Sequence, residues 1–77
     1  MDLTDNDENT LYDAGFRRGM AGVWEQTVKG STQWGERHWL NEWNNKWRIS
    51  THRNMTTTHA PWAQTPAAAV LAWELTR

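Results

Sequence analysis

Basic side chains stand beside aromatic ones along much of the chain, and these residue types point to binding rather than to catalysis. Seven tryptophans occur in 77 residues. Exposed rings can stack on unpaired nucleobases while arginine and lysine contact phosphates, so such a surface suits single-stranded or structured RNA. The alternative is a solvated helix face with scattered charge. The candidate RNA- or partner-binding residues are Arg17, Arg18, Arg37, Lys46, Arg48, Trp24 and Trp34.

Residues that commonly carry catalysis or bind metals lack a matching arrangement. The three histidines, His38, His52 and His59, are spaced too irregularly for a recognised zinc site. Neither Ser31 nor Ser50 has a nearby His–Asp arrangement that would activate a hydroxyl nucleophile. We therefore expect a protein that is not an enzyme and that uses no catalytic residue, no metal and no cofactor.

The charge is unevenly distributed. The formal net charge is −1, which argues against a strongly basic nucleic-acid binder. Residues 1–13 carry five acids and no base, whereas residues 14–77 carry eight bases against four acids. The acidic end either masks a mildly basic body or simply favours the positive end of a first helix.

Cysteine content and hydropathy bear on the compartment. The chain has no cysteine and hence no disulfide framework. The acidic start is wrong for a secretory signal. Residues 67–73 form the longest apolar run, far below the roughly 20 residues that span a bilayer. We expect a cytoplasmic protein without a membrane partner.

Thr10 to Trp24 has the period of an amphipathic helix. Thr10 followed by Asp13 resembles a capping box, and Asn9 could equally serve as the N-cap. Gly15, Gly19 and Gly22 fall on the apolar side of this helix. Each interior glycine costs a helix about 1 kcal/mol relative to alanine. The pattern therefore predicts a groove against which another helix packs, in a helix that ends at Gly22 or continues to Lys29.

Residues 36–49 supply the predicted counterpart. Trp39, Trp43 and Trp47 form a stripe at helical spacing, with a polar surface on the other side. We expect an antiparallel helical hairpin over residues 10–49. Its predicted core is Tyr12, Gly15, Phe16, Gly19, Gly22, Trp39, Leu40, Trp43 and Trp47.

The remaining segments complete an all-α prediction. Residues 1–9 are expected to be an acidic, disordered N-terminus, and residues 50–65 a linker rich in Thr and His. Residues 66–77 are predicted to form a C-terminal helix, with Thr65 as N-cap and Pro66 at its first position. This helix is apolar on nearly all sides and so packs over the hairpin or mediates self-association. The residues predicted for self-association are Val70, Trp73 and Leu75.

Two blocks of the sequence resemble the ribosome modulation factor family. The first is Gly15-Phe16-x-x-Gly19-x-Ala21-Gly22, preceded by Tyr12, and the second is Trp39-Leu40-x-x-Trp43. Small phage and prophage proteins share the pattern. The resemblance implies two helices joined by a linker, binding to the small ribosomal subunit near the 3′ end of its rRNA, and translation silencing with ribosome hibernation. The RNA contacts that it implies are Arg17, Arg18, Arg37, Lys46 and Arg48.

Three functions remain open at this point. The first is a cytoplasmic regulator of translation that binds the ribosome or rRNA. The second is a small phage-encoded inhibitor that binds a host protein through an aromatic helical surface, as a homo-oligomer. The third is a structural subunit that self-assembles through its C-terminal helix.

Overall fold

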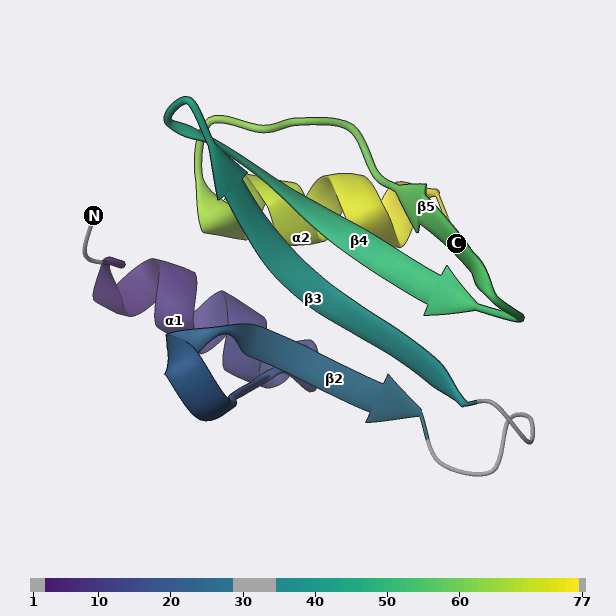
Figure 1. Ribbon diagram of the computed structural model, residues 1–77. Coiled ribbons are helices and arrows are strands. Elements are labelled where there is room, and N and C mark those ends of the chain that lie inside the picture. Colours follow the sequence, from purple (N-terminus) through teal and green to yellow (C-terminus); the bar gives the residue numbers. More distant parts are fainter. Residues whose placement is uncertain (1–2, 29–34, 77) are drawn as a thin grey trace.

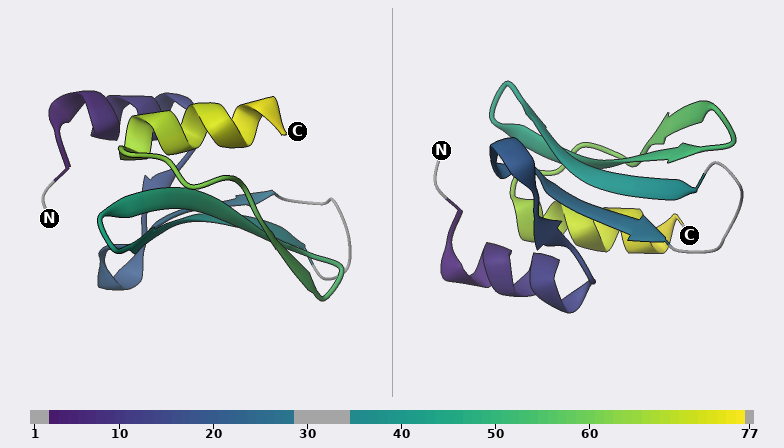
Figure 2. Two further views of the ribbon diagram at one scale, coloured as in Figure 1. Left: turned by 90° about the horizontal axis from the view of Figure 1, so that it is seen from above. Right: turned by 60° about the horizontal axis from the view of Figure 1, so that its bottom comes forward.

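An antiparallel sheet dominates the molecule. The computed structural model describes residues 3–28 and 35–76, and in these the sheet has five strands in the order β1-β2-β3-β4-β5 (Figure 1). Two helices lie together on one face of it (Figure 2). The all-α prediction is therefore wrong. The elements are α1 (Asp5–Asp13), β1 (Arg17–Arg18), a 3-10 turn η1 (Met20–Gly22), β2 (Trp24–Val28), β3 (Glu36–Trp43), β4 (Lys46–Arg53), β5 (Thr56–His59) and α2 (Pro66–Leu75).

Helix α1 begins earlier and ends earlier than the sequence predicts. Its N-cap is Thr4, whose side chain accepts a hydrogen bond from the Asp7 amide while the Asp7 carboxylate accepts one from the Thr4 amide. The helix ends before Gly15, whose φ angle is +96°. The Phe16 amide donates to the Leu11 carbonyl and the Gly15 amide to the Tyr12 carbonyl, which is a Schellman motif. Half of the predicted disordered segment is thus helical, and the predicted helix over 10–24 stops at Asp13.

The three glycines serve turns and not a groove between helices. Gly15 and Gly22 both have positive φ, at +96° and +75°, a region that side-chain-bearing residues seldom adopt. Gly22 ends η1 and leads the chain into β2, and Gly19 precedes η1. The glycine pattern therefore marks the places where the chain reverses, and the predicted helical hairpin core does not form.

Strands β3 and β4 replace the predicted second helix. The chain reverses between them at Asn44 and Asn45, whose φ values are 55° and 61°, as a two-residue type I′ turn requires. Trp39 and Trp43 lie on β3, and Trp47 lies on β4. The spacing of four residues is even, so it keeps two side chains on one face of a strand just as it does on a helix.

Half of the segment predicted as a linker is strand. Residues 50–53 complete β4, and β5 follows after a second turn at Asn54 and Met55, with φ values of 51° and 64°. Beyond β5 the chain still follows β4, since the amide and carbonyl of Ala63 both bond to the backbone of Trp47, at 2.7 and 2.8 Å.

The C-terminal helix is confirmed. α2 spans Pro66–Leu75, and the Thr65 side chain accepts a hydrogen bond from the Ala68 amide. The Asp7 carboxylate of α1 also accepts a hydrogen bond from the Ala67 amide, at 3.1 Å, and so ties the two helices together.

The core lies between the helices and the inner face of the sheet. Trp73 of α2 packs edge-on against Phe16, with ring centroids 5.3 Å apart. Of the predicted hairpin core, Phe16, Leu40 and Trp47 are core residues, but with partners other than those predicted. The buried hydrophobic residues are Leu11, Phe16, Leu40, Trp47, Ile49, Ala60, Ala69, Val70 and Trp73.

Candidate nucleic-acid interface

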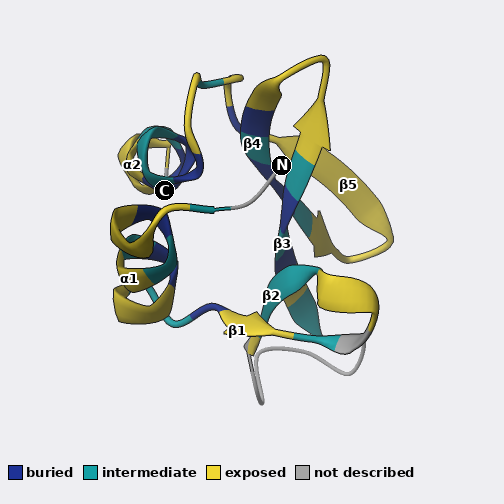
Figure 3. Cartoon of the chain, turned by 90° about the vertical axis from the view of Figure 1, so that its left-hand side faces the viewer, coloured by how far each residue is buried: buried dark blue, intermediate teal, exposed yellow. Residues whose placement is uncertain are grey.

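The face of the sheet opposite the helices is not covered by any element of the described chain. Side chains alternate between the two faces of a strand. Leu40 and Ile49 pair across β3 and β4 and point into the core, so the next pair along, Trp39 and Ser50, points away from it. Figure 3 shows both helices on the same side of the sheet.

Strand register defines the residues of this surface, which we call the open face. Rows of side chains run across neighbouring strands, for example from Glu25 through Trp39 and Ser50 to His59. Trp62 joins them because Ala63 pairs with the inward-facing Trp47, which places the preceding side chain on the outer side. The open face comprises Glu25, Thr27, Arg37, Trp39, Asn41, Trp43, Lys46, Arg48, Ser50, His52, Thr57, His59 and Trp62.

Two tryptophans stand side by side at one end of the open face. Trp43 is 69% exposed and Trp62 is 37% exposed. Their ring centroids are 6.4 Å apart, with the planes inclined at 39°. The guanidinium carbon of Arg48 lies 4.1 Å from the centroid of the Trp62 ring, within the range of a cation–π contact.

The third indole of this face, that of Trp39, is held by a hydrogen-bonded chain across three strands. Its Nε1 donates to Asn41 Oδ1 at 3.0 Å. The Asn41 amide donates to Ser50 Oγ, and Ser50 Oγ lies 2.7 Å from His59 Nδ1. Arg37 lies over the same indole, with its guanidinium carbon 5.4 Å from the ring centroid. Trp39 is therefore half-buried and fixed in orientation.

The two layers of the molecule differ in charge. Helices α1 and α2 together carry five acids and no base, namely Asp5, Asp7, Glu8, Asp13 and Glu74. The open face carries three bases and one acid, a net of +2 without the histidines. That acid, Glu25, lies 2.5 Å from the Arg37 guanidinium. Lys46 and Arg48 form no ion pair with the described residues.

Of the predicted binding residues, Arg37, Lys46 and Arg48 come together on the open face. Arg17 pairs with Glu25 at the β1 edge of the same sheet, but its side chain lies over the ring of Tyr12 and bonds to the Tyr12 and Phe16 carbonyls.

Of the other three predicted binding residues, the structure describes two, and neither lies on this face. Arg18 is exposed on β1, and Trp24 is half-buried and packs against the core. Trp34 lies outside the described residues.

The tryptophans of this surface are not among the binding residues that the sequence predicts. Trp39 and Trp43 were placed in the helical hairpin, and Trp62 fell in the linker. A signal for β3 was available, because residues 36–43 also fit a period of two, with His38 and Leu40 on the buried face. The paired asparagines that follow are a hairpin signal of their own.

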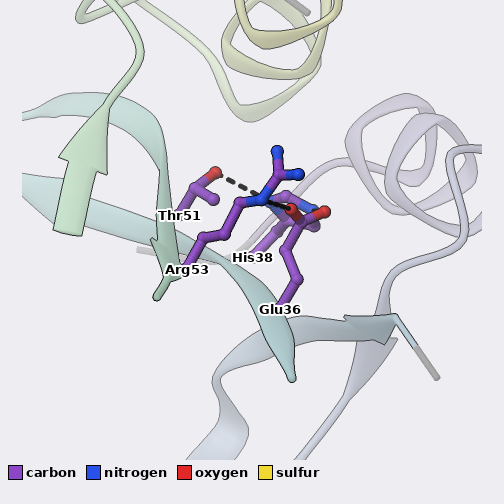
Figure 4. A network of polar contacts seen from close by, with 4 residues as sticks. All are labelled: Glu36, His38, Thr51 and Arg53. Carbon is purple, nitrogen blue, oxygen red and sulfur yellow. Dashed lines mark hydrogen bonds and ion pairs between the residues drawn. The ribbon is translucent and has the colours of Figure 1, made fainter. Parts of the chain in front are cut away.

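Figure 4 shows a polar network of Glu36, His38, Thr51 and Arg53. Strand register places it on the inner face, at the end of β3 and β4 away from Trp43. His38 is 6% exposed, and its Nδ1 and Nε2 lie 2.7 Å from Thr51 Oγ1 and 3.1 Å from Glu36 Oε2. The second Glu36 oxygen pairs with Arg53 Nε at 3.2 Å. Trp73 packs against the His38 ring, at 5.0 Å between centroids.

This network lines a groove of about 810 Å³ beneath the end of α2. Both ring nitrogens of His38 have partners, as a buried imidazole requires. We assign the network to the edge of the core, where it gives polar atoms of β3 and β4 their hydrogen bonds.

The residues predicted for self-association are divided between core and surface. Val70 and Trp73 are 1% and 4% exposed and pack within the chain's own core. Leu75 is 88% exposed, and its neighbour Leu71 is 60% exposed. Leu75 is therefore the one member of the predicted set that is available to a partner.

No helix within residues 3–28 and 35–76 has the length and apolar character needed to cross a membrane. Comparison with known proteins returned no match among family models, curated proteins or solved structures.

Proposed function

We propose that the protein binds single-stranded RNA through the open face of its sheet. The observation that carries the proposal is the gathering of Trp39, Trp43 and Trp62 with Arg37, Lys46 and Arg48 on one face, which no helix of the described chain covers. Stacking of a base on an aromatic side chain contributes about 1–3 kcal/mol and tolerates any base, while basic side chains contact the backbone.

The spacing of the indoles favours an extended strand. Trp39 and Trp43 are four residues apart on β3, and a strand advances about 3.3 Å per residue, so their Cα atoms are about 13 Å apart. Two rings so separated stack on different bases. In duplex RNA the bases are stacked on each other and their faces are inaccessible, so an unpaired strand is the better ligand.

The charge distribution favours binding of RNA to the sheet side of the molecule. The helical layer is acidic and the open face is basic, so a polyanion approaching the molecule meets attraction on the sheet side and repulsion on the helix side. The helices carry five negative charges and the open face a net of +2, and the rest of the chain brings the total to −1. The weak overall charge therefore does not argue against a local RNA site.

Small-subunit rRNA is the specific ligand that the family resemblance favours, with translation silencing in the cytoplasm as the consequence. The resemblance implies five basic residues as RNA contacts, and three of them share the open face. These are Arg37, Lys46 and Arg48, and they are the support that the structure offers. The helical hairpin that the resemblance implies is absent, so this proposal depends on surface chemistry alone.

A fluorescently labelled oligouridylate tests the general proposal. With about three phosphate contacts, the logarithm of the binding constant should fall with the logarithm of salt concentration with a slope of about −2. Arg48→Gln should weaken binding and make the slope shallower by about 0.7. Arg53→Gln is the matched control, since Arg53 lies at the inner groove. Absence of binding at low salt, or equal losses in both variants, would refute the proposal.

Sedimentation separates rRNA from RNA in general. The purified protein is mixed with ribosomal subunits and resolved on a sucrose gradient. Co-migration with the small subunit that Arg48→Gln reduces supports the rRNA proposal. Binding to oligouridylate without co-migration would refute the rRNA proposal and leave the RNA-binding proposal in place.

An inhibitor of a host protein is the second candidate. The observation in its favour is the exposure of Leu71 and Leu75 on α2, next to an acidic rather than a basic surface. Association through this surface, with a partner or a second copy, should persist in high salt and be lost in Leu71→Ser/Leu75→Ser. Salt-sensitive association that the double variant leaves intact would count against this candidate.

A further inference from the structure

We propose that Trp43 and Trp62 form a clamp for a single nucleobase, with the phosphate of that nucleotide bound by Arg48 and Lys46. This inference rests on the proposed RNA binding, since it names the place on the open face where one base is held between two rings. The ligand class is an unpaired nucleotide, either free or within a strand.

The distance between the two indoles is the first argument. A flat ring inserted between two others needs about 7 Å between the outer rings, twice the carbon–carbon contact distance of about 3.5 Å. The Trp43 and Trp62 centroids are 6.4 Å apart, which is the spacing of an aromatic pair in contact, so Trp43 has to turn away from Trp62 before a base can enter. The planes are inclined at 39°, so a modest rotation of one ring is needed to make the three rings parallel.

The surroundings of the two rings differ in a way that permits this rotation. Trp43 is the last residue of β3, precedes the Asn44–Asn45 turn and is 69% exposed. Trp62 precedes Ala63, which two backbone hydrogen bonds fix to β4. The backbone next to Trp62 is thus fixed, whereas the exposed Trp43 side chain has space to rotate.

The charges at the clamp select the ligand chemistry. Aromatic pairs also bind quaternary ammonium groups, but Arg48 and Lys46 would repel a cation. The nearest acid in the sequence, Glu42, pairs with the inward-facing Trp47 and so belongs to the other face. An aromatic ligand carrying a negative charge is therefore favoured, and a nucleotide combines the two properties.

Arg48 supplies a second, independent argument. Its Nε is buried and has no hydrogen-bond partner among the described residues. A buried donor without an acceptor is costly, and a phosphate oxygen is a good acceptor for a guanidinium. Because this Nε is covered, a phosphate oxygen can accept from it only once the contact between Arg48 and Trp62 opens, which the entry of a base beside Trp62 would bring about.

Nuclear magnetic resonance of the seven tryptophan indole groups tests the clamp. Titration with adenosine monophosphate should shift the indole signals of Trp43 and Trp62, whereas ribose 5-phosphate should leave them in place. Trp62→Ala and Trp43→Ala should each weaken binding of the nucleotide by about tenfold, the equivalent of one lost stacking contact. Circular dichroism checks that each variant is folded, which we expect for the exposed Trp43.

Trp39→Ala is the matched control, because Trp39 lies on the same face but outside the clamp. It should weaken oligouridylate and leave the affinity for adenosine monophosphate unchanged. If oligouridylate binds but the nucleotide shifts neither clamp signal, the clamp is refuted and the RNA-binding proposal stands. Binding of tetramethylammonium in place of the nucleotide would overturn the charge argument, and failure of both nucleotide and oligouridylate would overturn both proposals.

Discussion

Replacement of Asp7 should destabilise the fold far more than any other acid of its helix. The Asp7 side chain is 6% exposed, and its two oxygens accept hydrogen bonds from the Thr4 amide and hydroxyl and from the Ala67 amide, at 3.2, 2.9 and 3.1 Å. One carboxylate therefore caps α1 and also binds the first turn of α2, sixty residues away.

The expected loss follows from these bonds. Loss of a helix cap costs about 1 kcal/mol, and leaving the part-buried amide of Ala67 without its acceptor costs about 1–3 kcal/mol. Asp7→Ala should therefore lower the free energy of unfolding by about 2–4 kcal/mol. In a domain of this size that corresponds to a fall in Tm of about 10 °C or more. Asp7→Asn should be intermediate, since the amide keeps one acceptor oxygen.

Asp5→Ala is the matched control. Asp5 lies in the same first turn but is exposed and makes no side-chain hydrogen bond to the described residues. Its replacement should therefore remove only the interaction of the carboxylate with the helix dipole, which contributes about 0.3–1 kcal/mol. Thermal and urea unfolding give the stabilities, and amide hydrogen exchange at Ala67 reports the contact between the helices. Equal losses in Asp5→Ala and Asp7→Ala, or unchanged exchange at Ala67 in the latter, would refute the reasoning.

Three further substitutions test other parts of the fold by thermal unfolding. Gly15→Ala should cost about 1–3 kcal/mol, because φ is +96° at this position. An unchanged Tm would contradict the Schellman motif. Met55→Gly should stabilise the protein by about 0.5–1 kcal/mol, because Met55 has φ 64° and is 79% exposed; a lower Tm would contradict the turn. Trp73→Ala should cost about 3–5 kcal/mol, whereas Trp43→Ala should cost less than about 0.5 kcal/mol; similar losses would contradict their assignment to core and surface.

The C-terminal helix was predictable because its signals are local. Thr65 followed by Pro66 marks the start of a helix whatever lies around it, and the alanines that follow favour helix. The N-terminal signals were also local but were assigned to the wrong pair of residues. Thr4 and Asp7 have the same capping spacing as Thr10 and Asp13, and the buried contact between Asp7 and Ala67, which distinguishes them, comes from the tertiary structure.

The sheet was missed because even spacings do not distinguish a strand from a helix. Trp39 and Trp43 share a face in either structure, so the deciding positions are those between them. His38 and Leu40 are buried together while Trp39 is half-exposed, an alternation that no helix gives. The glycine spacing predicts a groove for helix packing, whereas in the structure Gly15 and Gly22 allow the chain to turn.

The basic part of the site was predictable where the aromatic part was not. Arg37, Lys46 and Arg48 were selected for their charge alone, which does not depend on the secondary structure assumed. The tryptophans were assigned by a burial argument, which does depend on it. An indole is core or surface according to the face it lies on, and the sequence pattern alone did not determine that face.

Trp43 carries the strongest argument that the open face has a function. A buried indole stabilises a fold in proportion to the apolar area removed from water, but Trp43 keeps 69% of its surface exposed and the core is complete without it. Three hydrophobic side chains grouped on one uncovered face favour aggregation unless they have a partner. The stability of the fold therefore explains Trp47 and Trp73, and it does not explain Trp43, Trp62 and the unpaired Arg48 beside them. A ligand that stacks on the rings and accepts the guanidinium hydrogen bonds accounts for all three.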